Sequence, residues 1–380
     1  MDRIAKWTKW KTESLAVATV FMIMSLLFGA WLGRLPEVQI KLALTKSALG
    51  FALLGLPAGG LIGTQLASLF SRRISTAQST FISAFIFCIF IVLPSLAFNW
   101  WTLLIGLFLV GLFDGWLNVA MNAAAADIEE VWKVSIMSSC HGMFSLGAMF
   151  GAGIAGVAAS LEIPFTLQQV ILGALMLVLL INIRPFLDQV PTRPKSEKQA
   201  FAWPEKQVWG FVFIGFCIMI GEGAIADWAA IYLKSNLGSS LLVASMGFAA
   251  FSFAMTIGRF SGDYLRVRYS AIFLVTISCL IGGGGLLLCV AAISIELTII
   301  GFWLAGIGFS LVVPILFILT AQRARNPEAG IAAVATSGIV GFMLAPPIIG
   351  MVGDQYGLDN AFLGVAILAI IAAFISYRMR

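Results

Sequence analysis

Three polar side chains stand at helical spacing inside the apolar run of residues 100–126. Asp114, Asn118 and Asn122 are four residues apart, so one helix would stack them on one face. A carboxylate in the middle of a membrane span costs about 2.5 kcal/mol or more, and it therefore needs water, a partner or a substrate. Amides both donate and accept hydrogen bonds, which suits a polar solute. We predict proton coupling at Asp114 and substrate binding at Asn118 and Asn122. The alternatives are a buried structural acid and amides that join helices.

Two further acids lie in the apolar run of residues 207–233. Glu222 stands between Gly221 and Gly223, and glycine on both sides loosens a helix. Interrupted helices that line a cavity are typical of transporter sites. We predict that Glu222 is a second proton-coupling residue. Asp227 is about 140° away around the helix, at 100° per residue, so the two acids need not do the same work.

One arginine closes the first apolar run. Arg34 precedes Glu37 by three residues. We predict that Arg34 pairs with Asp227 or Glu37 as an outer gate. The alternative is an interfacial arginine that extends toward the lipid headgroups.

The only histidine and two tryptophans complete the predicted substrate-binding set. His141 can titrate near neutral pH and relay protons. It is expected at the depth of Asn122, because the two residues lie on consecutive antiparallel helices. Trp31 and Trp228 could stack on a sugar-like or aromatic ligand. The alternatives are a hydrogen-bonded structural histidine and aromatic rings that only pack.

The composition excludes a soluble domain. Hydrophobic residues make up 60% of the 380 residues and charged residues only 11%, whereas a soluble surface needs charge. The apolar runs are continuous over about 18 residues or more, which indicates helices and not the alternating strands of a β-barrel. We predict an all-α membrane protein with twelve spans, near residues 14–33, 48–70, 77–98, 100–126, 138–160, 164–184, 207–233, 241–260, 270–292, 296–320, 331–352 and 361–377.

The distribution of basic residues predicts the orientation. With the N-terminus in the cytoplasm, 19 of the 23 lysines and arginines fall on the cytoplasmic side, as the positive-inside rule requires. Both termini are therefore expected in the cytoplasm, and the protein in the inner (plasma) membrane. The basic N-terminal segment is expected to precede an uncleaved first helix. The net charge of +5 is explained in this way without nucleic acid.

The chain divides into two similar halves. The polar segment of residues 184–206 holds four prolines and has the composition of a linker. We predict an N-terminal six-helix bundle at 1–184, a cytoplasmic linker at 185–206 and a C-terminal six-helix bundle at 207–380. Gly106 and Gly111 recur 195 residues later as Gly301 and Gly306, and parallel six-helix repeats are a known transporter plan.

A motif after the eighth span resembles that of a known family. Arg259, Asp263 and Arg266 belong to the stretch GRFSGDYLRVR, which is similar to the cytoplasmic loop motif of the major facilitator superfamily. The copy after span two, LFSRR, has no aspartate. A branch of rhizopine-permease-like and fucose-permease-like proteins is more similar, through the stretches WLGRLPE, NVAMN, SSCHGMFSLG and EGAIADWAAIYL. The resemblance implies alternating access by two halves, with Arg259, Asp263 and Arg266 as conformational contacts.

These observations together predict a secondary active transporter of a small organic solute, a monomer in the lipid bilayer. No nucleotide-binding motif is present, so this chain alone cannot use ATP. The carboxylates within the spans make the proton the expected coupling ion, with sodium left open. No cofactor or metal site is expected, because the five cysteines form no cluster with His141. A proton-driven exporter of toxic compounds and a non-transporting sensor or scaffold are the alternatives. A membrane enzyme is not expected, because it would need a cluster of catalytic groups.

Overall fold

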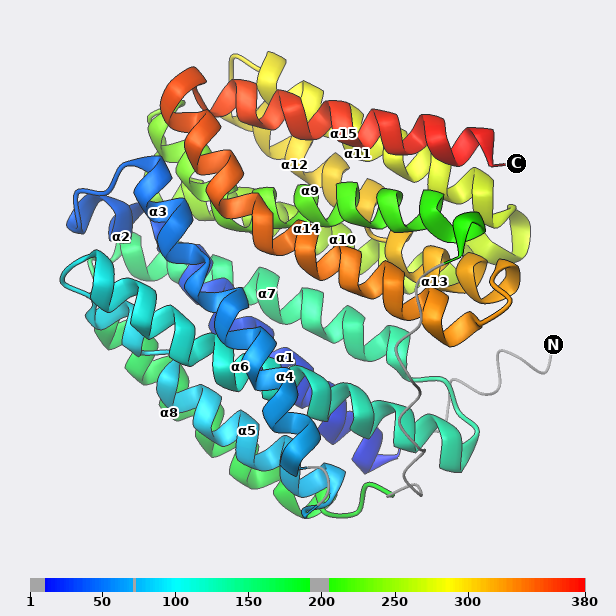
Figure 1. Cartoon of the computed structure of the whole chain (residues 1–380). Coiled ribbons are helices and arrows are strands. Elements are labelled where there is room, and N and C mark those ends of the chain that lie inside the picture. Colours follow the sequence, from blue (N-terminus) through cyan, green and yellow to red (C-terminus); the bar gives the residue numbers. More distant parts are fainter. Residues whose placement is uncertain (1–10, 71–72, 192–204, 380) are drawn as a thin grey trace. The chain divides into compact units, whose positions relative to one another are not determined.

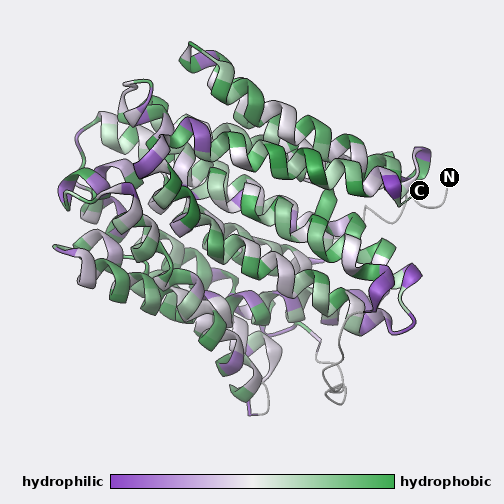
Figure 2. Ribbon diagram, turned by 45° about the horizontal axis from the view of Figure 1, so that its top comes forward, coloured by the Kyte–Doolittle hydropathy of each residue, from purple (hydrophilic) through white to green (hydrophobic). Residues whose placement is uncertain are grey.

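The computed structural model describes residues 11–70, 73–191 and 205–379, apart from the side chain of Asp263. Within these residues, twelve helical segments are long and apolar enough to cross a membrane, so the predicted all-α fold is confirmed. Figure 2 shows hydrophobic residues along the helices and hydrophilic residues gathered at many of the connections. The chain separates into two compact units, whose boundaries fall between residues 31 and 32, 51 and 52, and 196 and 197.

Unit 1 contains the described part of residues 1–31 and 52–196. Its helices, labelled in Figure 1, are α1 (Thr12–Leu32, up to residue 31), α4 (Gly55–Phe70), α5 (Thr76–Phe90), the short η2 (Leu93–Leu96), α6 (Trp100–Trp132), α7 (Met137–Ser160) and α8 (Phe165–Leu187).

Unit 2 contains residues 32–51 and the described part of 197–380. Its helices are α2 (Leu35–Lys41), most of α3 (Lys46–Leu53), η3 (Lys206–Val208), α9 (Trp209–Ser235), α10 (Leu241–Arg268), α11 (Ala271–Ala291), α12 (Ile295–Phe309), α13 (Val312–Arg323), α14 (Pro327–Tyr356) and α15 (Leu358–Arg378). Residues 32–51 precede the predicted linker in sequence, yet they group with the C-terminal helices.

Two of the predicted spans are broken helices. The second consists of α3 and α4, separated at Leu54, and the tenth consists of α12 and α13, separated at Ser310 and Leu311. Pro314 lies in the first turn of α13, where proline costs no hydrogen bond. The helix α14, in contrast, continues through Pro346 and Pro347.

Glycine allows close helix packing in each unit. In unit 1, a Cβ atom at Gly59 of α4 would collide with the backbone of Phe108 in α6. In unit 2, a Cβ atom at Gly285 of α11 would lie 2.6 Å from the carbonyl oxygen of Gly301 in α12. Small residues at such contacts let two backbones approach, which is how membrane helices associate.

Candidate functional site

The helix α6 carries the predicted polar face of unit 1. A capping box at Asn99 and Thr102 begins this helix, and it continues to Trp132, six residues beyond the predicted end. Asp114 and Asn122 are half-buried, and Asn118 is exposed. The Nδ2 atom of Asn122 donates to the backbone oxygen of Asn118 at 2.8 Å and to its Oδ1 atom at 3.3 Å. The two amides are therefore stacked one turn apart.

Asp114 is the chemically unusual member of this face. Among the described residues, none forms a hydrogen bond or ion pair with its carboxylate. The neighbouring Gly115 packs against the backbone of Gly60 in α4, which fixes the rotation of α6 beside α4. A half-buried acid on a membrane helix, without a fixed protein donor, is open to a proton, to water or to a solute.

Other side chains near this face are satisfied by the protein. The indole nitrogen of Trp116 donates to the Ser79 hydroxyl at 2.8 Å, and its ring stacks on Phe70 with a centroid distance of 4.6 Å. Trp116 therefore packs α6 against α4 and α5. Asp127, which is buried, accepts from the Thr76 hydroxyl at 2.9 Å.

His141 lies on α7 and is half-buried. Its ring meets Phe21 of α1 edge-on, with centroids 5.4 Å apart. The expected approach of His141 to Asn122 and its role in substrate binding remain predictions.

The two tryptophans predicted to bind substrate are core residues in this conformation. Trp31 is 1% exposed and stacks on Phe165 at a centroid distance of 5.9 Å. Trp228 is fully buried, and its indole nitrogen has no hydrogen-bond partner within the described chain. Packing explains the position of both rings, so stacking on a ligand would require them to move.

Glu222 is the half-buried candidate acid of unit 2. The expected interruption beside it is wrong, because α9 is continuous from Trp209 to Ser235. Gly221 and Gly223 instead admit close neighbours: a Cβ atom at Gly221 would lie 2.7 Å from Phe309, and one at Gly223 would lie 3.0 Å from Ala345. The glycines therefore serve helix packing around the acid.

Arg259 is the charge partner of Glu222. The two side chains attract each other electrostatically across the contact between α9 and α10. The predicted loop containing Arg259, Asp263 and Arg266 is wrong as a loop, because α10 remains helical to Arg268. Arg266 is exposed, and the Asp263 side chain lies outside the described structure. Part of the degraded first copy, at residues 71 and 72, is also outside it.

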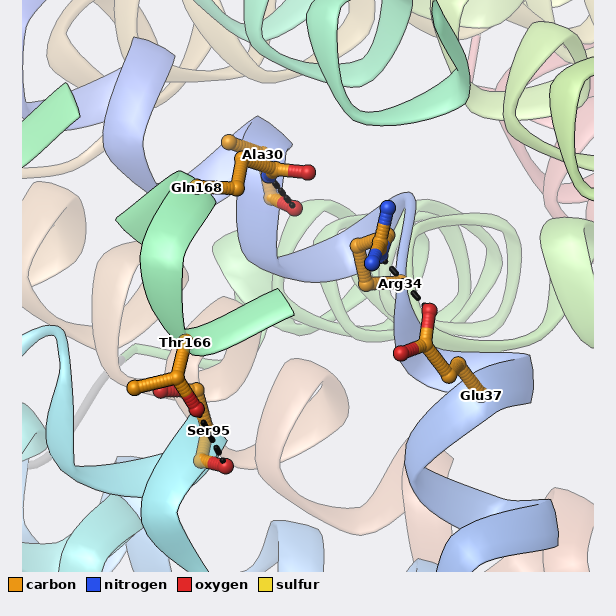
Figure 3. A network of polar contacts seen from close by, with 6 residues as sticks. All are labelled: Ala30, Arg34, Glu37, Ser95, Thr166 and Gln168. Carbon is orange, nitrogen blue, oxygen red and sulfur yellow. Dashed lines mark hydrogen bonds and ion pairs between the residues drawn. The ribbon is translucent and has the colours of Figure 1, made fainter. Parts of the chain in front are cut away.

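Arg34 takes the nearer of its two predicted partners. Its Nε atom lies 2.8 Å from Oε2 of Glu37, while Arg34 is only 2% exposed (Figure 3). Burial lowers the pKa of the Arg34 guanidinium, and the attraction of Glu37 opposes that shift. The structure shows no ion pair between Arg34 and Asp227, because Glu37 follows Arg34 by three residues and reaches it locally. A gating role for these residues remains a prediction.

Asp227 is buried more deeply than Asp114 and Glu222. It is 6% exposed, and no described residue donates a hydrogen bond to it. A buried carboxylate without a donor or cation is costly, so this position carries an energetic penalty in the described conformation.

Several polar contacts were not predicted from the sequence. Figure 3 shows the Gln168 amide donating to the Ala30 carbonyl at 3.4 Å and the Thr166 hydroxyl donating to the Ser95 carbonyl at 3.2 Å, both within unit 1. In unit 2, the Tyr232 hydroxyl donates to Asp359. The position of Asp359, one residue after the start of the last span, was the sequence feature that could have indicated this contact.

The twelve apolar helical segments in the described part of the chain are those of a polytopic membrane protein, and the comparisons with known proteins give its class. The sequence profile of the Major Facilitator Superfamily matches residues 14–338, and the chain belongs to this superfamily. An uncharacterized MFS-type transporter of Yersinia pestis is 29% identical over 365 residues, covering 95% of this chain and 94% of that protein. The membrane protein MosC of Rhizobium meliloti is 30% identical over 363 residues, covering 94% and 88%.

The fold also agrees with solved transporters. A bacterial homolog of the human lysosomal transporter Spinster, in an inward-facing and occupied conformation, superimposes with a TM-score of 0.77 over 96% of each chain, at 15% identity. The architecture of this chain is therefore that of a superfamily of secondary transporters, and the identity of the transported solute must come from the site.

Proposed function

We propose that this transporter moves a small polar organic solute and that protons drive the movement. The observation that carries the proposal is the face of α6: an acid without a described protein partner, Asp114, followed at one-turn intervals by Asn118 and Asn122. Paired amides offer donors and acceptors to hydroxyl groups. The adjacent acid exchanges its proton when its surroundings change between wet and dry.

The acid of unit 2 supports a second, different contribution. Glu222 attracts Arg259, so its ionised form has a compensating charge that Asp114 lacks among the described residues. We propose that Asp114 binds the transported proton and that Glu222 responds to the occupancy of the site. These two roles account for the presence of an acid in each unit without requiring that both acids carry the transported proton.

A ligand screen by thermal shift tests the substrate class. The purified full-length protein is screened in detergent at pH 6 and pH 8 against pentoses, hexoses, cyclic polyols, nucleosides and lipophilic cations. We expect a hydroxyl-rich compound to raise the melting temperature, since a ligand that binds only the folded state stabilises it. For Asp114→Asn, we expect the same compound to stabilise equally at both pH values.

A matched control removes an acid elsewhere. Asp188, at the end of α8, is exposed and lies 3.7 Å from Arg184, so Asp188→Asn should keep the pH dependence of the wild type. Stabilisation by lipophilic cations alone would favour the exporter. A hydroxyl-rich ligand whose effect is independent of pH in the wild type would retain the solute and refute proton coupling.

Imposed gradients then test the coupling ion. With the compound found in the screen, wild-type proteoliposomes should accumulate it under a pH gradient and not under a sodium gradient. Asp114→Asn should equilibrate the compound without accumulating it. Accumulation driven by sodium alone would assign the coupling to sodium.

A further inference from the structure

The N-terminus of α3 is capped by a residue that is distant in sequence. The backbone N–H of Lys46 donates to Oδ1 of Asp354 at 2.9 Å, and that of Ser47 donates to Oδ2 at 2.7 Å. Asp354 lies in the last turn of α14, and all three residues belong to unit 2. We call this arrangement the α3 cap. The first N–H groups of a helix have no partner within it, and a negative charge there is favourable.

Close backbone packing accompanies the α3 cap. A Cβ atom at Gly350 would lie 2.5 Å from the carbonyl oxygen of Lys46, and one at Gly50 would collide with the carbonyl of Pro346. The Ser47 hydroxyl lies 3.4 Å from the carbonyl oxygen of Gly350. The first turns of α3 thus pack closely on α14 at Gly50 and Gly350, and the Asp354 carboxylate lies at the end of this contact.

The helix α3 contains a boundary between the two units. The second membrane span consists of α3 and α4, and the boundary between the two units crosses it after Phe51, just before the helix break at Leu54. One span is therefore shared between the units, and the α3 cap is the polar contact that holds its first part within unit 2. The charge distribution of the sequence predicts that this end of the span lies outside the cell.

We propose that Asp354 is a positioning residue for transport: its carboxylate holds α3 on α14 in one conformation and releases it in another. Asp354 is exposed, so water can replace both N–H groups when the contact opens. Its partners are the backbone N–H groups of Lys46 and Ser47 and the side chains of Ser47 and Thr45. Because the carboxylate itself is exposed, opening leaves no buried charge behind. A contact of this kind is strong enough to bias two conformations and weak enough to break.

The proposal goes beyond solute and proton binding, and its test needs neither. Ser47→Cys keeps the backbone N–H and introduces a thiol at the contact. The reaction of this thiol with a hydrophilic maleimide is followed by mass spectrometry on the full-length protein in detergent. The five native cysteines are all buried and report on general unfolding in the same sample.

Asp354→Asn should expose the thiol at position 47. The Asn side chain offers one acceptor oxygen in place of two, and it carries no charge. We therefore expect labelling at position 47 to rise about tenfold relative to the native cysteines, which corresponds to about 1.4 kcal/mol. Asp188→Asn is the control and should leave the ratio unchanged. Gly350→Ala keeps the carboxylate and obstructs the contact, so it should raise the ratio as well; it decides the matter if Asp354→Asn does not fold.

Two results would overturn the proposal. In one, Asp354→Asn, or Gly350→Ala in its place, leaves the labelling ratio at the value of the Ser47→Cys protein, so the contact of α3 with α14 does not control access to position 47. In the other, the native cysteines and the thiol at 47 become reactive together, so the α3 cap opens only when the protein unfolds and is a permanent structural contact.

Discussion

Removing the hydroxyl of Tyr232 should destabilise unit 2 by about 2 kcal/mol. The side chain is 2% exposed, and its hydroxyl lies 2.5 Å from Oδ1 of Asp359 and 3.2 Å from the carbonyl oxygen of Cys289. One hydroxyl proton serves one acceptor at a time, so Tyr232→Phe loses a single strong bond. A hydrogen bond to a charged group contributes about 1.5–3 kcal/mol. The phenyl ring should keep its edge-on contacts with Phe302 and Phe362. The lost free energy of unfolding therefore comes from the hydrogen bond and not from a cavity.

The assay is thermal unfolding of the purified protein in detergent, with a fall of roughly a few degrees expected for Tyr232→Phe. Tyr356→Phe is the matched control, because Tyr356 is 67% exposed and should tolerate the change. Asp359 also accepts from Asn236 at 3.0 Å, which keeps the acid partly satisfied. If Tyr232→Phe melts at the same temperature as Tyr356→Phe, the hydrogen bond to Asp359 contributes nothing to the free energy of unfolding.

Three further substitutions and one control, Gly153→Ala, test the packing and the buried charges by the same unfolding assay. Gly111→Ala places a methyl group against the Leu56 carbonyl and should cost about 1–3 kcal/mol, whereas Gly153→Ala, which meets nothing within 4 Å, should cost nothing. Glu129→Ala removes the acceptor of two backbone N–H groups at the start of α7, at 2.7 and 2.8 Å, and should cost about 1–2 kcal/mol; no change would show that water replaces it. Asp227→Asn removes a buried negative charge without a described donor and should stabilise the protein; destabilisation would mean that the carboxylate is held by a partner.

The twelve spans could be predicted because crossing a membrane requires a continuous apolar run, which a single sequence displays directly. The ends were less predictable. The fourth span was predicted to end near residue 126, yet α6 continues to Trp132, because Asp127 is bonded to Thr76 and Glu129 caps α7. A helix end depends on such tertiary partners, and composition does not contain them.

The candidate site could also be predicted only in part: the shared face of one helix was predictable, but the partners of its charged residues were not. Helical spacing alone placed Asp114, Asn118 and Asn122 on one face, since 3.6 residues per turn leaves little freedom. Pairing across helices was not determined in this way: Arg34 had two possible partners, and the local one, Glu37, forms the ion pair. Sequence reasoning also took the glycines beside Glu222 as a source of flexibility, whereas the neighbouring helices use them for close contact.

The sequence repeat is visible in the packing of both units but not in their acids. Gly111 of α6 packs on the carbonyl of Leu56, and Gly306 of α12 packs on that of Phe251, with the same separation along the chain in both pairs. At the repeat distance from Asp114, however, α12 carries Phe309, which is buried and packs against Gly221, beside Glu222.

Helix contact is needed in both units, so the glycine positions recur, whereas each unit carries its half-buried candidate acid on a different helix: α6 in unit 1 and α9 in unit 2. Glu222 has Arg259 as a charge partner, while Asp114 has no partner among the described side chains. Because their helices and their electrostatic surroundings differ, the two acids are not interchangeable, and neither should compensate for the loss of the other.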